Sequence, residues 1–313
     1  MLTRRSMVRD LLFVLAVAVP IGCGGDPAST SGGTSTETGS GGSGGSHAMV
    51  DRGPTSIVLD GDPNGLFWDA PTGTLYIADN HNNRVLQWTD AAGIGLVADL
   101  PGGAQNSAGL GQLVKAKDGT IAVTIFGFGA TGGVAFIAPD KSTGMVPSLD
   151  PVKRRIGLAI ADDGTLYDSY FENITGSKQI GAIARLDLAG AETDVVTSLK
   201  KPVGLLAAGS NLIISDQTSA AVLVAPIASP TNVTTLAQLD GPDLLSAGPN
   251  GTYFTGGSNG EVRRIASDGT VSTFAGGFIQ IRGVAYDAQN KRLFAAEHDP
   301  EGTKSALRIL PVD

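Results

Sequence analysis

Six related apolar segments recur in this 313-residue chain, and three of them are followed by an acidic residue, aspartate in two and glutamate in one. Asp79, Asp216 and Glu297 occupy the same place, directly after runs such as TLYIA and NLIIS, and Tyr170 occupies it in another copy. A ring of carboxylates could hold a cation. Alternatively, each carboxylate accepts hydrogen bonds from the backbone of its own turn, and the sequence favours this role for Asp79 and Asp216.

A second recurring position lies directly before the first strand of each copy. It is polar in three copies, Asn64, Asp243 and Arg282, and apolar in the others, Gly111, Ile156 and Val203. Such a mixed set suits a small amphiphilic ligand. An ion pair between Asp243 and Arg282 with no ligand is the alternative. Because a guanidinium repels a metal ion, we expect Arg282 to pair with Asp243 or with an anionic ligand, and we predict no metal site.

The composition excludes several classes of protein. Lys plus Arg is 22 and Asp plus Glu is 30, a formal net charge of −8, so a basic nucleic-acid surface is not expected. A single cysteine excludes an internal disulfide framework and a cysteine-based zinc site. The sequence has no GxSxG elbow, HExxH helix or phosphate-binding loop, and we predict no catalytic residues.

The elements that carry these side chains form an internal repeat. GLFWDAPTGTLYIAD (65–79) aligns without a gap with GVAYDAQNKRLFAAE (283–297). Each copy is an apolar strand, a polar turn and a second strand, and a second hairpin follows it. The six copies begin at Gly65, Gln112, Gly157, Gly204, Leu244 and Gly283, about 39 to 47 residues apart.

This pattern predicts an all-β fold, a six-bladed β-propeller of four-stranded antiparallel blades over residues 51–313. The last copy stops at Asp313 without a fourth strand. Residues 55–60, TSIVLD, resemble that missing strand, so an N-terminal strand should complete the last blade and leave no open sheet edge there.

The segment Asp79-Asn80-His81-Asn82-Asn83-Arg84-Val85 resembles the NHL repeat, and the whole pattern resembles the gluconolactonase-like propellers. The NHL resemblance implies that His81 closes its loop. The gluconolactonase-like resemblance implies a divalent cation at the channel mouth, held by Glu, Asn and Asp residues before the first strands. By position, only Asn64 and Asp243 match that pattern in this chain.

The N-terminal residues predict export. Residues 1–22 combine Arg4, Arg5 and Arg9 with an apolar run too short to span a bilayer, which is typical of a signal peptide. Cys23 after Gly22 resembles a bacterial lipobox, and plain secretion is the alternative. Ordinary and twin-arginine export both stay open. Residues 23–50 are rich in Gly, Ser and Thr and predict a flexible tether.

Two hypotheses of function follow. The first is a monomeric cell-envelope lipoprotein, lipid-anchored at Cys23 and expected in the outer membrane in preference to the inner membrane, whose propeller binds a small molecule, glycan or protein on its loop face. The expected ligand-binding residues are Asn64, Asp79, Tyr170, Asp216, Asp243, Arg282 and Glu297, with residues 170–180 as a specificity loop. The alternative is a lactonase-like hydrolase, the only case in which Ca²⁺ is expected as a cofactor. A lyase or strictosidine-synthase-like activity also stays open.

Overall fold

The computed structural model describes residues 55–102, 109–174, 178–301 and 305–313. The predicted signal segment, Cys23 and the tether lie outside these residues. Within them, no helix has the length and apolar character needed to cross a membrane.

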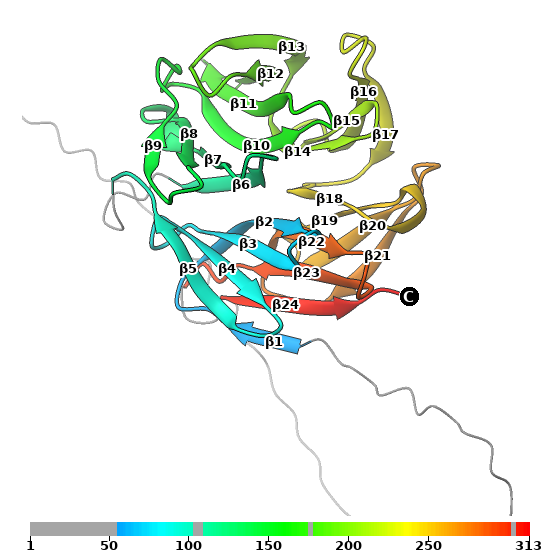
Figure 1. The fold of residues 1–313 in the computed structure, drawn as a ribbon. Coiled ribbons are helices and arrows are strands. Elements are labelled where there is room, and N and C mark those ends of the chain that lie inside the picture. The colour runs from blue at the N-terminus through cyan, green and yellow to red at the C-terminus, as the bar shows by residue number, and fades with distance from the viewer. Residues whose placement is uncertain (1–54, 103–108, 175–177, 302–304) are drawn as a thin grey trace, which may run out of the picture. The chain divides into compact units, whose positions relative to one another are not determined.

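The strands form six four-stranded antiparallel sheets (Figure 1), as the repeat predicts. Blade one contains β2 (Pro63–Asp69), β3 (Thr74–Asp79), β4 (Arg84–Thr89) and β5 (Gly93–Asp99). Blade two contains β6 (Leu110–Lys115), β7 (Ile121–Ile125), β8 (Gly133–Ile137) and β9 (Thr143–Met145). Blade three contains β10 (Arg154–Ile160), β11 (Leu166–Ile174), β12 (Lys178–Leu186) and β13 (Glu192–Leu199).

Blades four to six repeat this arrangement. Blade four contains β14 (Pro202–Ala208), β15 (Asn211–Asp216), β16 (Ala221–Pro226) and β17 (Thr234–Gln238). Blade five contains β18 (Leu245–Ala247), β19 (Tyr253–Thr255), β20 (Glu261–Ile265) and β21 (Val271–Gly276). Blade six contains β22 (Ile281–Asp287), β23 (Arg292–Glu297), β24 (Ala306–Pro311) and β1 (Thr55–Val58). In the described part of the chain, two short 3₁₀ turns, η2 (Gly127–Gly129) and η3 (Pro249–Gly251), lie between strands.

The N-terminal strand closes the ring. β1 pairs antiparallel with β24, with Thr55 opposite Ile309 and Val58 opposite Ala306. The innermost strands β2, β6, β10, β14, β18 and β22 each contact the next, and β22 contacts β2. The predicted six-bladed, all-β fold with its N-terminal closing strand is therefore confirmed.

The core lies between neighbouring blades. All six residues of β3 are buried, because blade neighbours cover both of its faces. Tyr76 and Val85 of blade one pack with Leu113 and Val123 of blade two, which shows one such interface. Outer strands such as β5 alternate between half-buried and exposed positions, as expected for strands with one face in water.

A glycine that recurs near the start of inner strands β2, β10, β14 and β22 permits close packing around the channel. A Cβ atom on Gly65 would lie 2.2 Å from the carbonyl oxygen of Gly111 in the next blade. A Cβ atom on Gly283 would lie 2.2 Å from the carbonyl oxygen of Asn64. Any larger side chain would therefore push the neighbouring inner strands apart.

A β-bulge recurs beside that glycine. The pairing register of the inner strand shifts between Pro63 and Leu66, and at the equivalent places in blades two, three, four and six. Asn64, Gly111, Ile156, Val203 and Arg282 lie within these bulges. Because a bulge re-aims the side chain that it contains, this irregularity accounts for the direction of the residues at the channel mouth.

One local expectation was wrong. Residues 170–180 do not form a long loop, because β11 and β12 extend their pairing to Ile174 opposite Lys178. Glu172, Asn173 and Lys178 lie in these paired strands, and Phe171 and Gln179 of the same strands reach the cavity described below.

Candidate functional site

A cavity of about 310 Å³ opens at one end of the central channel. Its lining includes all six mouth positions expected from the sequence: Asn64, Gly111, Ile156, Val203, Asp243 and Arg282. We call this space the mouth cavity. The recurrent bulge therefore brings one residue from each of five blades to a common site, and Asp243 reaches it from the segment before β18 in blade five.

Asp243 and Arg282 form the expected ion pair. Arg282 Nη1 lies 3.3 Å from Asp243 Oδ2, and the Arg282 side chain is 35% exposed whereas that of Asp243 is 7% exposed. Burial raises the pKa of the Asp243 carboxyl, and the charge of Arg282 acts in the opposite direction. Asp243 is the single carboxylate among the described residues that line this cavity.

Two basic residues that the sequence reasoning missed also line the cavity. Arg154 lies two positions before Ile156, and Lys201 lies two positions before Val203. The signal was present in the sequence, since the basic runs KRR (153–155) and KK (200–201) precede these two mouth positions and not the others. The side of the mouth expected to be apolar therefore carries two positive charges.

Aromatic rings line the cavity on the side of blades two and three. Phe126 and Phe128, around η2, meet edge to face with ring centroids 5.0 Å apart, and Phe126 lies 6.0 Å from Phe171 of β11. The guanidinium carbon of Arg154 lies 5.3 Å from the centre of the Phe126 ring, and Lys201 Nζ lies 5.6 Å from that of Phe171. Cations and rings thus share one wall.

The carboxylates at the ends of β3, β15 and β23 accept hydrogen bonds from the chain segments that lead into their own blades. Asp216 accepts hydrogen bonds of 2.9 Å each from the backbone N–H groups of Lys200 and Lys201. Asp79 accepts one from Asp62 and Glu297 one from Ile279, at 2.9 and 2.8 Å.

Two of these carboxylates also accept hydrogen bonds from the turns that follow their own strands. Asp79 and Asp216 accept longer bonds from the turn amides of Asn82 and Ser219, so the turn role favoured by the sequence is confirmed for both. None of Asp79, Asp216 and Glu297 is among the described residues lining the mouth cavity. Asp216 nonetheless fixes the backbone that carries Lys201 into it.

The carboxylate of Asp79 also closes the NHL-like loop of blade one. Arg84 Nε lies 2.7 Å from Asp79 Oδ2, and the Asn82 side chain donates to Asp79 Oδ2 at 2.9 Å. His81 is exposed. Asp79, Asn82 and Arg84 therefore make the contacts that the resemblance had assigned to His81.

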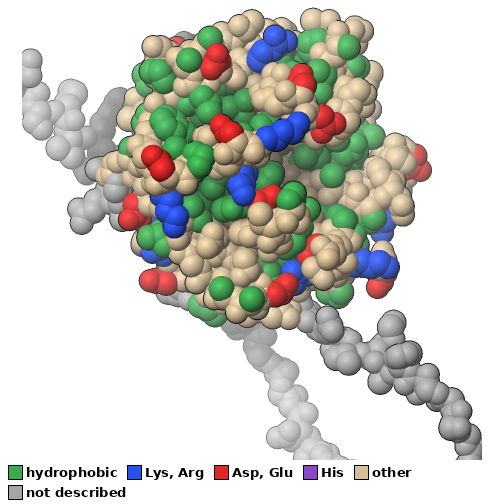
Figure 2. Space-filling view, viewed as in Figure 1, with side chains coloured by type: hydrophobic (Ala, Val, Ile, Leu, Met, Phe, Trp, Pro, Cys, Tyr) green, Lys and Arg blue, Asp and Glu red, His purple; other side chains and the backbone are tan. Residues whose placement is uncertain are grey.

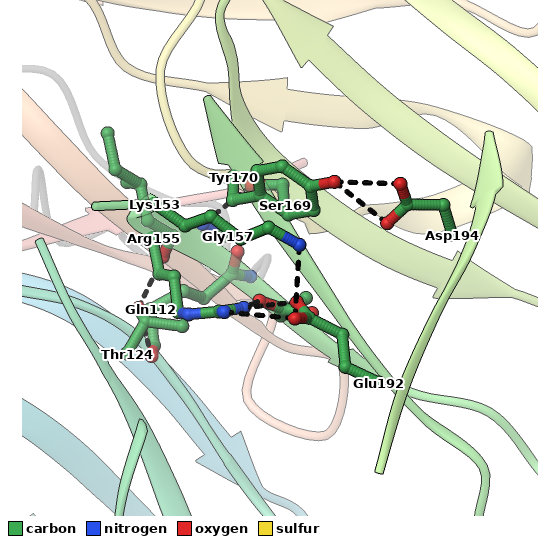
Figure 3. A network of polar contacts seen from close by, with 11 residues as sticks. Gln112, Thr124, Lys153, Arg155, Gly157, Ser169, Tyr170, Glu192 and Asp194 are labelled. Carbon is green, nitrogen blue, oxygen red and sulfur yellow. Dashed lines mark hydrogen bonds and ion pairs between the residues drawn. The ribbon is translucent and has the colours of Figure 1, made fainter. Parts of the chain in front are cut away.

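Tyr170 belongs to a polar network inside blade three (Figure 3). Its hydroxyl lies 2.8 Å from each carboxylate oxygen of Asp194, and Lys153 Nζ lies 3.7 Å from the centre of its ring. Below it, Arg155 is fully buried and pairs with Asp168 and Glu192. Tyr170 is not among the described residues that line the mouth cavity.

The residues of the mouth do not fit a divalent cation. Asn64 donates its amide to the carbonyl oxygen of Leu110 at 2.5 Å, and the Asp243 carboxylate is engaged by Arg282. Gly111, Ile156 and Val203 have no side-chain ligand atoms. Three basic side chains line the same space, and calcium normally gathers six to eight oxygen ligands. Among the described residues, no cluster of three or more His, Cys, Asp and Glu side chains could hold a metal.

The chain is similar in fold to solved enzymes and binding proteins. No family model and no curated protein sequence match it. A gluconolactonase from Xanthomonas campestris superposes with a TM-score of 0.67 at 17% identity, over 83% of this chain and 89% of that one. A calcium-binding protein, regucalcin, from Agrobacterium tumefaciens gives 0.65 at 16%, over 82% and 93%.

A lyase shares the same architecture. Virginiamycin B lyase from Staphylococcus aureus superposes with a TM-score of 0.58 at 13% identity, over 83% of this chain and 99% of that one. This chain is thus a six-bladed propeller with gluconolactonase-like structural neighbours. Identities this low establish the shared fold, and function must be argued from the site.

Proposed function

We propose that this protein is an exported, lipid-anchored propeller that binds a small molecule at the mouth of its central channel. One observation carries the proposal: an open cavity of about 310 Å³ in which basic, amide and aromatic side chains from several blades converge. Ligand pockets typically measure about 300–1,000 Å³ and combine apolar walls with a few placed polar groups. The cavity is at the small end of that range, which favours a small ligand over a glycan chain or a protein.

The anchor is proposed from the sequence of residues 1–23. A Cys23→Ser variant should move from the membrane fraction to the soluble fraction, or stay unprocessed. Unchanged membrane partitioning of that variant would contradict the lipid anchor and leave the proposed ligand site unaffected.

Binding is tested by filling the cavity. An Ile156→Trp variant places a large ring among the lining residues, whereas Val152→Trp changes an exposed side chain between β9 and β10 that is not among them. Small molecules that raise the melting temperature of the unmodified protein should lose that effect with Ile156→Trp and keep it with Val152→Trp. Equal responses of both variants would contradict binding at the mouth.

Lactone hydrolysis is the second candidate, and the observation that favours it is the gluconolactonase-like fold. A hydrolase built on these residues would rely on Asp243, since it is the described carboxylate in the cavity and burial raises its pKa, which suits a general base. Turnover of a lactone panel that is lost in Asp243→Asn, measured with calcium and with chelator, would favour this candidate over binding alone.

A further inference from the structure

We propose that the ligand of the mouth cavity is a small organic anion with an aromatic group, its carboxylate or other oxyanion bound among Arg154, Lys201 and Arg282 and its ring packed against Phe126, Phe128 and Phe171. This inference rests on the proposed function and names the class of ligand.

The charge of the lining supports an anion. Three basic side chains and one acidic side chain line the mouth cavity, an excess of two positive charges in a chain whose net charge is −8. On the face of the molecule in Figure 2, basic and acidic side chains lie interspersed among apolar and other groups. A local excess of one sign in a concave site concentrates ligands of the opposite sign.

Two of these cations have no protein counter-ion among the described residues. Several basic side chains elsewhere are paired, such as Arg84 with Asp79, Lys115 with Asp69 and Arg292 with Asp90, whereas others, such as the exposed Arg185, form no ion pair in the described ranges. Within the described ranges, no carboxylate oxygen lies within 4.0 Å of the charged nitrogens of Arg154 or Lys201. The sequence of the internal gaps 103–108, 175–177 and 302–304 contains no Asp or Glu.

Lys201 is also partly removed from water. It is half-buried, and its pKa is lowered because burial disfavours the charged form and because Arg282 and Arg154 repel it, while Asp243 acts in the opposite direction. A partly desolvated cation with like charges as neighbours gains most from an entering anion. The position of Lys201 is fixed through its backbone by Asp216, so the charge is held in place before a ligand arrives.

The aromatic wall supports a planar apolar group on the ligand. Phe128 is 63% exposed beside the cavity, although an exposed ring of this size is costly to leave in water. Its backbone has φ 50° and ψ 20°, a left-handed conformation that a bulky residue rarely adopts. Phe128 lies beside the opening, edge to face with Phe126, where a ligand ring could cover both.

The two halves of the ligand are tested separately with three probes. 2-Naphthoate has a ring and a charge, 2-naphthamide has the same ring without a charge, and acetate has the charge without the ring. Calorimetric titration of the purified full chain should give a dissociation constant for 2-naphthoate at least about tenfold lower than for either other probe, as a charge-assisted hydrogen bond implies.

Variants assign the effect to the cavity. Arg154→Gln and Lys201→Gln should each weaken 2-naphthoate binding about tenfold or more. Phe128→Ala should weaken 2-naphthoate and 2-naphthamide alike. The control is Arg185→Gln, which removes the same charge from an exposed residue near the far end of β12, outside the mouth cavity.

The outcomes separate this inference from the proposed function. Equal affinities for 2-naphthoate and 2-naphthamide, unchanged in Arg154→Gln and Lys201→Gln but lost in Ile156→Trp, would overturn the anion and leave small-molecule binding in place. Tight acetate binding would overturn the aromatic part. If none of the three probes binds, while another small molecule binds in a manner lost in Ile156→Trp, the inference is wrong and the proposed function stands. If no small molecule binds, both are wrong.

Discussion

Arg154 and Arg155 are neighbours in β10, yet their side chains enter opposite surroundings. Arg155 is fully buried in the blade-three charge cluster, which we define as Lys153, Arg155, Asp168 and Glu192 (Figure 3). Its Nη1 and Nη2 lie 2.6 and 3.2 Å from the two oxygens of Glu192, and Nη1 also contacts Asp168. Arg154 instead lines the mouth cavity beside Lys201 and Arg282.

The difference lies in charge balance. The blade-three charge cluster contains two basic and two acidic side chains, and all four are paired in the protein. The mouth cavity contains three basic side chains and one acidic side chain. A balanced buried cluster is a structural element of the fold, whereas an unbalanced set at the open end of a channel is suited to a charged ligand.

The largest expected effect comes from the same substitution at the two neighbours. Arg155→Gln leaves Asp168 buried without its partner and Glu192 paired with Lys153 alone, and should lower the free energy of unfolding by about 3–5 kcal/mol. Arg154→Gln removes a cation with no described carboxylate partner and should change the free energy of unfolding by less than about 1 kcal/mol. Urea denaturation of both variants measures this. Similar losses of stability would contradict the distinction between cluster and mouth.

The next effect is the pH dependence of the cluster. Burial raises the pKa of Asp168 from 3.8 to about 6, with Arg155 acting in the opposite direction. Because the folded state then binds this proton more tightly than the unfolded state, the contribution of Asp168 to stability should fall as pH rises from about 4 to 6, by up to about 3 kcal/mol. The unfolding free energies of the unmodified protein and Asp168→Asn, compared across this range, should differ by that trend. Parallel pH profiles would show that Asp168 ionises normally.

A pH effect of another kind is expected at the mouth. Because the pKa of Lys201 is lowered, this residue should lose its charge at a lower pH than an ordinary lysine. The affinity for 2-naphthoate should therefore begin to fall at a lower pH than that at which an ordinary lysine loses its charge, while Arg154 and Arg282 stay charged. Lys201→Arg is the matched control and should bind with an affinity that changes little with pH. A flat profile in the unmodified protein would show that the Lys201 charge does not contribute to binding.

The smallest expected effect separates positioning from binding. Asp216→Asn weakens the hold on the backbone of Lys200 and Lys201, and should raise the dissociation constant of 2-naphthoate about threefold, since one acceptor oxygen remains. Asp79→Asn alters the same kind of contact in blade one, where the held segment carries no cavity cation, and should leave the affinity unchanged. Equal effects on affinity would indicate a general loosening of the channel mouth.

The sequence was sufficient for the features that repeat. The alignment of 65–79 with 283–297 predicts the blades, the strand-like TSIVLD predicts the closing strand, and the place before each inner strand predicts the six mouth residues. These features follow from local periodicity, because the same pattern of residues recurs in each copy of the repeat.

The features that do not repeat were missed. Arg154 and Lys201 line the cavity in two blades, but the equivalent residues of the others, such as Asp62, Gly109 and Gln280, are not basic, so alignment of the copies does not single out these positions and only the local basic runs indicate them. The η2 segment with Phe126 and Phe128 is particular to blade two. The hydrogen bonds that Asp79, Asp216 and Glu297 accept from the segments leading into their blades join residues 15–18 positions apart. The residue types alone do not reveal these bonds.

The most direct test of the account is the place where an aromatic anion binds. A crystal structure of the protein with 6-bromo-2-naphthoate would locate the bromine by its anomalous signal. The account predicts the ring against Phe126 and Phe128, with the carboxylate within hydrogen-bond distance of Lys201 and Arg154. Binding instead in the larger cavity of about 540 Å³ between blades two and three, which Arg185 and Leu188 help to line, would contradict it.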